Sequence, residues 1–430
     1  MPALDSGAET FALPPELTPK RVITDYLRFL GQLGLKKLAE QWGSFKQDDV
    51  AVVLSVPAAW SDSAKQTMRQ AAVDAGLVHS SDPGALMLVH EPEAAALTVL
   101  KEVQDPIAMS EGDSFVVVDA GGGTVDITCH LVERKKGQLV LTEETHREGV
   151  LAGSTYLNTM MEDYVRRKLG GTVYDDWKEA KPVDAVKLVH DKVELQKRSF
   201  DGTSPIKLEV PLSLLRVIPT TLDARQPTHQ GMCNSASKVH PPPPKCRQAF
   251  AGSVTHRIVS PDVPSQAVLK GAAMYALAPD AIYARRSRHA YGVETHTAFR
   301  RGLRPDLRYT EPDSNKVLCK KVFSSLVQLN ELVEHDQVKV GSYVAVYKHQ
   351  KAVEFNLYAC SNNSDRYVDS AAMKKIGNVT LQITDPTKVT DPDAYSFTVS
   401  FRLGGSELTA TAIDNQTNLE VQTTVIFVAE

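Results

Sequence analysis

The sequence predicts a mixed α/β fold over its larger N-terminal part and an antiparallel β-sandwich at its C-terminal end. Short apolar segments alternate with amphipathic ones as far as about residue 97, which is typical of a layered α/β domain. Three consecutive glycines, Gly121–Gly123, interrupt a strand-like segment at residues 115–128. After residue 322 several segments alternate apolar and polar residues with period two, which favours antiparallel sheets.

Composition narrows the class of protein. The 430 residues are enough for two or three domains with a large core. A net charge of −4 without basic bias argues against a nucleic-acid partner. No apolar segment approaches the roughly 20 residues that span a bilayer, so we expect no membrane insertion. The start lacks the features of a signal peptide, and the five cysteines show no CxxC spacing. A reduced, cytoplasmic protein fits these observations.

The first hundred residues predict two helix–strand pairs. Residues 19–42 carry apolar side chains at helical spacing, and residues 50–56 form a continuous apolar segment that indicates a buried strand. Ser61 is suited to cap a helix over residues 63–75. Residues 86–89 predict a second strand, and Glu91 stands where that strand becomes a helix, before Pro92 in the first helical turn.

The glycine segment predicts a strand–turn–strand hairpin that binds phosphate. Without Cβ atoms, the backbone of Gly121, Gly122 and Gly123 can curl closely around a phosphate, and Thr124 adds a hydroxyl donor. Asp119 and Asp126 flank the turn and are suited to hold hydrated Mg²⁺, which prefers carboxylates together with phosphate oxygens. The alternative is a tight glycine hairpin with acidic flanks and no ligand.

Four motifs in series carry a family resemblance. They are Ala51–Trp60, Gln70–Leu77, His90–Ala96 and Asp119–Asp126. In this order and spacing they resemble the nucleotide-binding domain of the 70-kDa heat-shock chaperones, which has the actin-like (ribonuclease H-like) fold. Trp60 and the Glu-Pro-Glu of residues 91–93 are similar to its divergent heat shock 70 kDa protein 12 branch. The resemblance implies ATP and Mg²⁺ as ligands, with Glu91, Asp119 and Asp126 as the catalytic residues.

Two later segments extend the resemblance. Gly149–Ser154 resembles the family's second glycine loop, so Gly153 and Ser154 are expected at the phosphates, with Ser154 suited to cap the following helix. Glu194, Lys197 and Arg198 match the family's adenosine-contacting Glu-x-x-Lys-Arg pattern. The alternative for this second segment is a solvated helix face with an i,i+3 Glu–Lys pair.

The chain also departs from the family pattern. Residues 219–256 replace the expected adenine loop with a proline-rich irregular insert, in which four successive prolines exclude a helix or central strand. The family's first phosphate hairpin and its catalytic Lys are not found before Pro19. We therefore expect a disordered start over residues 1–18 and a partial nucleotide-binding domain over 19–290. Residues 260–273 resemble the helix that closes this domain at its hinge.

The C-terminal part completes the predicted organisation. The composition changes at Tyr291, and residues 300–321 are basic and irregular, so residues 291–321 are interpreted as a linker. Residues 322–430 form the β-sandwich, whose position resembles the family's substrate-binding domain, with Phe397, Val399 and Phe401 in its core.

These features favour an atypical chaperone-like protein that binds ATP or ADP, couples nucleotide state to client or partner proteins, and has weak or absent hydrolysis. The alternative is a nucleotide-independent scaffold or adaptor that binds partners through the β-sandwich. A sugar or acetate kinase of the same superfamily ranks third, because those enzymes lack the Trp60 and Glu-Pro-Glu variants and the C-terminal sandwich.

Overall fold

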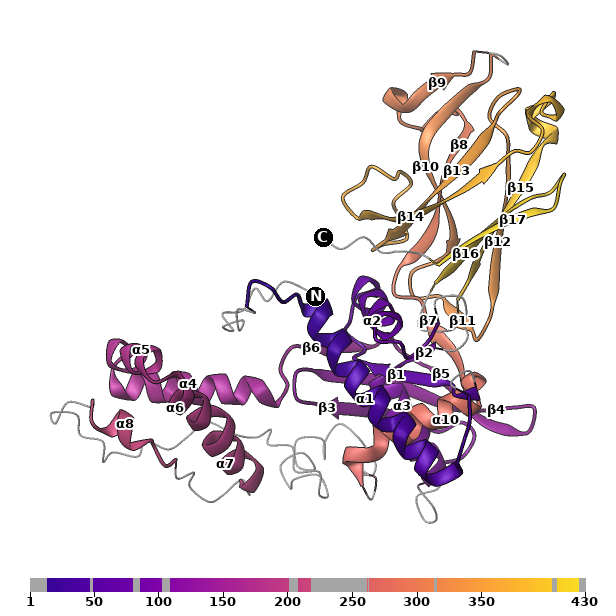
Figure 1. The fold of residues 1–430 in the computed structure, drawn as a ribbon. Helices are drawn as coiled ribbons and strands as arrows, with labels where there is room; N and C mark the ends of the chain where they lie inside the picture. Colours follow the sequence, from indigo (N-terminus) through magenta and orange to yellow (C-terminus); the bar gives the residue numbers. More distant parts are fainter. Residues whose placement is uncertain are drawn as a thin grey trace.

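The computed structural model shows a mixed α/β protein with several separate sheets (Figure 1). The structure describes residues 14–46, 49–79, 86–102, 109–200, 208–217, 261, 263–312, 315–403 and 408–424. The expected proline-rich insert, and the start as far as residue 13, lie outside the described residues. None of the helices in the described ranges is long and apolar enough to cross a membrane.

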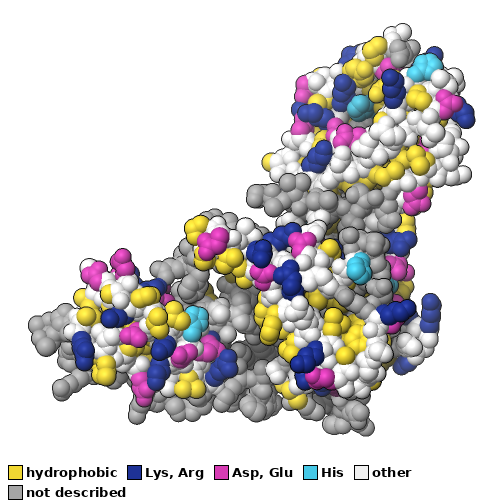
Figure 2. Space-filling model, viewed as in Figure 1, with side chains coloured by type: hydrophobic (Ala, Val, Ile, Leu, Met, Phe, Trp, Pro, Cys, Tyr) yellow, Lys and Arg dark blue, Asp and Glu magenta, His cyan; other side chains and the backbone are white. Residues whose placement is uncertain are grey.

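The N-terminal elements form a small parallel α/β layer. Strands β1 (Val52–Val56) and β2 (Leu86–His90) pair in parallel. Helix α2 (Asp62–Asp74) lies between them in the chain, and Ser61 caps it by accepting a hydrogen bond from Ala64 N, as predicted. Helix α1 (Pro19–Trp42) has the predicted bounds. Its apolar stripe is largely exposed, however: Tyr26 and Phe29 are both 62% accessible, and hydrophobic side chains gather over this helix in Figure 2.

A six-stranded sheet forms the centre of the molecule, in the order β11-β7-β5-β4-β3 with β6 paired to β4. Its strands are β3 (Ser114–Ala120), β4 (Val125–Lys135), β5 (Gln138–Glu143), β6 (Glu148–Val150), β7 (Ile282–Arg286) and β11 (Leu332–Glu334). The β3–β4 hairpin is the predicted one. The apolar residues 115–118, most of them β-branched, predict a buried strand, and this prediction was wrong, because β3 is at the sheet edge and exposes Val116 and Val118.

One face of this sheet is covered by two helices packed closely together. Helix α3 (Glu91–Glu102) follows β2 directly, and α10 (Ala267–Leu277) contains residues 267–273 of the predicted closing segment. A Cβ atom at Gly271 would lie 1.6 Å from the carbonyl oxygen of Ala94, so only glycine allows this approach. Thr98 Oγ1 also donates to the Ala267 carbonyl at 2.6 Å.

A group of helices extends from the sheet around its own small core of Val165, Tyr174, Trp177, Ala185, Leu188 and Leu214 (Figure 1). It comprises α4 (Ser154–Leu169), α5 (Gly171–Ala180), α6 (Pro182–Val186), a π-helical segment (Lys187–Val193), α7 (Glu194–Ser199) and α8 (Leu212–Leu215). The helix predicted over residues 183–198 is thus present, with a π-helical middle.

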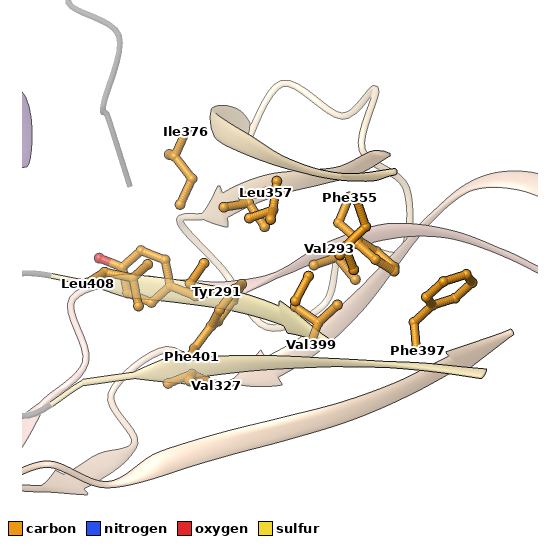
Figure 3. Close-up of a cluster of buried hydrophobic side chains, with 14 of the residues drawn as sticks. Tyr291, Val293, Val327, Phe355, Leu357, Ile376, Phe397, Val399, Phe401 and Leu408 are labelled. Carbon is orange, nitrogen blue, oxygen red and sulfur yellow. The ribbon is translucent and has the colours of Figure 1, made fainter. Parts of the chain in front are cut away.

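Two antiparallel sheets at the C-terminal end share one hydrophobic core (Figure 3). The five-stranded sheet has the order β14-β13-β8-β10-β9, and the four-stranded sheet the order β12-β15-β16-β17. Their strands are β8 (Ala290–Ala298), β9 (Arg308–Thr310), β10 (Val317–Val327), β12 (Val338–Val344), β13 (Ala352–Cys360), β14 (Met373–Gln382), β15 (Ser396–Arg402), β16 (Thr409–Asp414) and β17 (Leu419–Thr424). Phe397, Val399 and Phe401 are completely buried between the sheets, as their alternation predicted.

The irregular linker expected over residues 291–321 was wrong. This segment holds β8, β9 and the start of β10, and β8 is a central strand paired with both β10 and β13. In β8 the first four residues, Ala290–Val293, are buried and the later residues, among them Glu294 and His296, are only partly buried, so the polar end of the strand concealed it from a composition-based prediction.

Candidate functional site

The glycine turn joins β3 and β4 and leaves open space on its outer side. Asp119 and Asp126 are direct cross-strand partners at its base, and Gly121 N donates to Thr124 O at 2.9 Å. None of the three glycines has a positive φ. A Cβ atom at Gly122 or Gly123 would meet no heavy atom within 4 Å. Neither backbone strain nor internal crowding therefore requires glycine at these two positions. A ligand that approached the backbone closely would require it.

Three carboxylates converge beside this turn. Glu91 comes from the first turn of α3, and Asp119 and Asp126 come from the ends of β3 and β4. Burial and, to a smaller extent, the negative charges of Asp119 and Asp126 together raise the pKa of Glu91 to about 7. Burial and then the charge of Asp126 raise the pKa of Asp119. The three carboxylates that the sequence analysis expected as a catalytic trio thus lie near enough to influence one another's pKa, and a bound cation would reduce their mutual repulsion.

Asp126 is fixed by the loop after β1. Its Oδ1 accepts a hydrogen bond from Ala59 N at 2.9 Å, while its buried Oδ2 has no hydrogen-bond partner. Gly149 on β6 packs against this carboxylate, since a Cβ atom there would lie 2.4 Å from Asp126 Oδ1. An orphaned buried oxygen beside two other carboxylates fits a hydrated Mg²⁺ that also binds phosphate oxygens.

The described residues contain no group of three or more His, Cys, Asp or Glu side chains arranged to hold a metal ion alone. Asp119 and Asp126 would therefore hold Mg²⁺ only in company with the nucleotide phosphates and water, as Mg²⁺ commonly is. Thr124 is buried at the end of the turn, 9% exposed. The residues present fit ATP·Mg²⁺ at the glycine turn.

The second glycine loop supports the first one. Three successive N–H groups at the start of α4 donate to glycine carbonyls: Gly153 N to Gly123 O at 3.1 Å, Ser154 N to Gly121 O at 3.0 Å, and Thr155 N to Gly122 O at 2.8 Å. A Cβ atom at Gly153 would lie 2.5 Å from Gly122 O. The expectation that Ser154 caps α4 was wrong, because Gly153 is the N-cap residue and makes no side-chain cap.

Glu194, Lys197 and Arg198 brace the same helix start. Lys197 is only 7% exposed; its Nζ donates to Ser154 O and Asn158 Oδ1, both at 3.0 Å, and it pairs with Glu194. Arg198 is largely exposed, and its Nε donates to Glu194 Oε1 at 2.9 Å. Partial burial opposes ionisation of Glu194, but hydrogen bonds from Lys197, Arg198 and Asn158 lower its pKa to about 2. The i,i+3 Glu–Lys pair of the alternative interpretation is therefore present, with Lys197 turned inward onto α4.

Sequence reasoning missed three residues of this arrangement. Ala59 acts through its backbone N–H, which no side-chain motif reveals. Thr155 donates its hydroxyl to Gly122 O at 2.7 Å, and Asn158 connects Lys197 to Glu194. Their positions at the start of a helix that follows a glycine loop are the signal that could have found them.

Known proteins resemble this chain over nearly its whole length. It is 25% identical to human (Homo sapiens) heat shock 70 kDa protein 12A in an alignment of length 504, which covers 93% of this chain and 74% of that protein. The mouse (Mus musculus) heat shock 70 kDa protein 12A is 24% identical over the same shares, and human heat shock 70 kDa protein 12B is 24% identical over 95% of this chain and 75% of that protein. A family model described as a domain of unknown function, DUF8340, matches residues 108–234.

Proposed function

Because the chain is a relative of the divergent heat shock 70 kDa protein 12 branch, we propose that it is an atypical chaperone-like protein that binds ATP or ADP at the glycine turn. Residues 19–290 form a partial nucleotide-binding domain of the actin-like (ribonuclease H-like) class. The two antiparallel sheets form a β-sandwich that binds client or partner proteins, and the protein works in the cytoplasm. Nucleotide state alters partner binding through the segment that joins the two parts.

The open cradle at the glycine turn is the observation that carries this proposal. Gly122 and Gly123 are glycine although the fold would accommodate a side chain there. The same cradle is bordered by three carboxylates whose mutual repulsion a cation would relieve. A hairpin with no ligand explains neither feature.

The chain's own residues divide the work at this site. The N–H groups of Gly122 and Gly123 would bind phosphate oxygens, and Asp119 and Asp126 would hold Mg²⁺, which supplies charge neutralisation when bound. Glu91, with a pKa of about 7, can hold or accept a proton at neutral pH, as a general base for an attacking water must.

We expect hydrolysis to be weak or absent. The described charges that act on Glu91 and Asp119 are those of carboxylates. Phosphoryl transfer also needs positive charge around the γ-phosphate, beyond the metal, to stabilise its transition state. A site that binds nucleotide and turns it over slowly fits this balance of charges.

Isothermal titration of the purified chain with ATP and ADP, with and without Mg²⁺, tests the proposal. Gly122→Val should abolish binding by filling the cradle. Gly34→Val in α1 is the matched control, because a Cβ atom there also meets open space and the site is remote. Loss of binding in both variants, or in neither, would contradict assignment of the nucleotide to the turn.

A nucleotide-independent scaffold is the second candidate, and one observation favours it. The N–H groups of Gly153 and Ser154 already donate to the glycine turn, and Lys197 is engaged with α4. Groups expected at the phosphates and the adenosine thus serve the fold itself. If the unmutated chain binds neither ATP nor ADP at millimolar concentration, the scaffold function takes first place.

A further inference from the structure

A buried ion pair connects two parts of the chain that lie far apart in the sequence. Arg285 on β7 donates from Nε to Glu93 Oε1 at 2.8 Å and from Nη2 to Glu93 Oε2 at 2.9 Å. Glu93 is 1% exposed and Arg285 is 5% exposed. Two parallel hydrogen bonds between a guanidinium and a carboxylate fix both the distance and the orientation of the two groups.

Further charged and polar groups surround this pair. His90 Nδ1 lies 3.1 Å from Glu93 Oε2, and Arg147 Nη1 lies 3.6 Å from Glu93 Oε1. Removal of one partner from a buried ion pair leaves the other charge without compensation, which is strongly unfavourable. Separation of β7 from α3 would therefore carry a large penalty, and the pair holds these two elements together.

Strand β7 is a connector strand: it belongs to the central sheet and leads directly into the C-terminal sheets, as β11 also does. It pairs in parallel with β5, where Leu141 opposes Ile282, and β11 pairs with its other edge. The next strand, β8, begins at Ala290 inside the five-stranded sheet. Movement of the C-terminal sheets relative to the central sheet would act on β7 and on its partner β11, and β7 carries Arg285.

Glu93 shares the first turn of α3 with Glu91, the carboxylate beside the glycine turn. Two residues along a helix differ by roughly 200° in direction, so the two side chains leave α3 on opposite sides. Glu91 interacts with Asp119 and Asp126, and Glu93 with Arg285. Pro92 lies between them and fixes one backbone dihedral angle, and the packing of Gly271 against Ala94 fixes the next residue.

We propose that Glu93 and Arg285 are a pair of positioning residues that lock the connector strand β7 to the first turn of α3. Because this turn also carries Glu91, the lock couples the position of β7 to the carboxylate site. The lock itself follows from the contacts of this pair. Its response to nucleotide rests on the function proposed above. A ligand that shifts Glu91 would rotate the short turn that also carries Glu93, and the buried contact would transmit that rotation to β7.

Hydrogen exchange of the full chain, followed by mass spectrometry, tests the lock. Glu93→Gln removes the negative charge with little change of shape, and exchange of the β7 amides should accelerate by at least about tenfold. Arg166→Gln is the matched control: Arg166 makes a bidentate pair with Asp175 at 2.8 and 2.6 Å, but about half of each side chain is exposed. That variant should leave β7 exchange unchanged.

A second arm tests the connection to the site. ATP·Mg²⁺ should change β7 exchange in the unmutated chain, and this response should vanish in Glu93→Gln even at nucleotide concentrations that saturate the variant. A response of equal size in both proteins would overturn the coupling. If the unmutated chain binds no nucleotide, the proposed function fails, while the first arm still decides the lock.

Unchanged β7 exchange in Glu93→Gln would overturn the lock itself. If Glu93→Gln loses its folded circular-dichroism spectrum, Arg285→Lys is measured instead. Lysine keeps the charge but not the two-pronged contact, so β7 exchange should accelerate in that variant too; exchange equal to that of the unmutated chain would reject the lock.

Discussion

At the scale of single residues, the glycines around the site have opposite roles. Gly122 and Gly123 leave space that a side chain could fill, whereas Gly149 and Gly153 leave no space at all. In the proposed function the first kind leaves room for a ligand, and the second kind lets β6 and the start of α4 approach the hairpin. Substitutions at the two kinds of position should therefore separate binding from stability.

We expect Gly153→Ala to destabilise the protein by about 1–3 kcal/mol, because the added methyl group would lie 2.5 Å from Gly122 O and one backbone would have to move. Gly122→Ala should leave stability nearly unchanged. Thermal unfolding of the two variants without nucleotide measures the difference. Equal losses would mean that the turn is crowded on both sides.

Glu91 should make the stability of the nucleotide-free protein depend on pH. Its pKa is about 7 in the folded state against 4.5 as its ordinary value, so the folded protein holds the extra proton between these values. Stability then falls as pH rises from about 4.5 to about 7. Urea unfolding in chelator should show that slope, and Glu91→Gln should reduce it. A slope unchanged in Glu91→Gln would assign the effect to other groups.

At the scale of elements, the start of α4 is held between the glycine turn and α7. Hydrogen bonds join Gly121–Gly123 to α4, and Lys197 joins α4 to α7. The sequence motif that predicted contact with adenosine therefore also forms a structural brace between α7 and α4. Movement of α7 would reach the phosphate cradle through one helix start.

Lys197→Met should weaken nucleotide binding more than Arg198→Met does. Lys197 is buried, and its loss leaves Ser154 O and Asn158 Oδ1 without this donor and removes one of the two cations paired with Glu194, at a cost of about 1–3 kcal/mol. Arg198 is 72% exposed, and its ion pair with Glu194 lies at the surface, where such pairs contribute little to stability. Calorimetric titration and thermal unfolding of both variants test this order, and a larger effect of Arg198→Met would favour direct adenosine contact through that side chain.

The elements themselves were largely predictable, and their burial was not. Periodicity predicted α1 and the β3–β4 hairpin because both depend on local pattern. Exposure of the α1 stripe and of Val116 on β3 depends on which neighbours each element has, which local pattern does not contain. The linker over residues 291–321 was misjudged for the same reason: pairing with β13 makes β8 a central strand.

At the scale of the whole molecule, separate hydrophobic cores support the central sheet and the C-terminal sheets. The contacts that join these parts include residues very distant in sequence, such as Glu93 and Arg285, which are 192 positions apart. Two of the four motifs predicted the carboxylate trio, because Glu91 lies in the motif of residues 90–96 and Asp119 and Asp126 lie in the motif of residues 119–126. No motif could predict the Glu93–Arg285 pair, whose partners meet only after the chain has folded.

Phe397→Ala should destabilise the C-terminal sheets by about 3–5 kcal/mol through loss of a fully buried ring. The three tryptophans, at positions 42, 60 and 177, all lie in the N-terminal part. Tryptophan fluorescence should therefore keep its unfolding midpoint while circular dichroism shows an earlier transition of the sheets. Coincident shifts in both signals would show that the two parts unfold as one unit.

The most direct test of the nucleotide assignment is a hydrogen-exchange footprint of the glycine turn in the unmutated chain. With ATP·Mg²⁺ present, peptides that contain Gly122, Gly123 and Thr124 should exchange more slowly than without nucleotide, because phosphate oxygens would accept hydrogen bonds from their amides. Chelation of Mg²⁺ should reduce that protection, since Asp119 and Asp126 would then repel the phosphates. Exchange at the turn that is identical with and without saturating ATP·Mg²⁺ would contradict a phosphate site there.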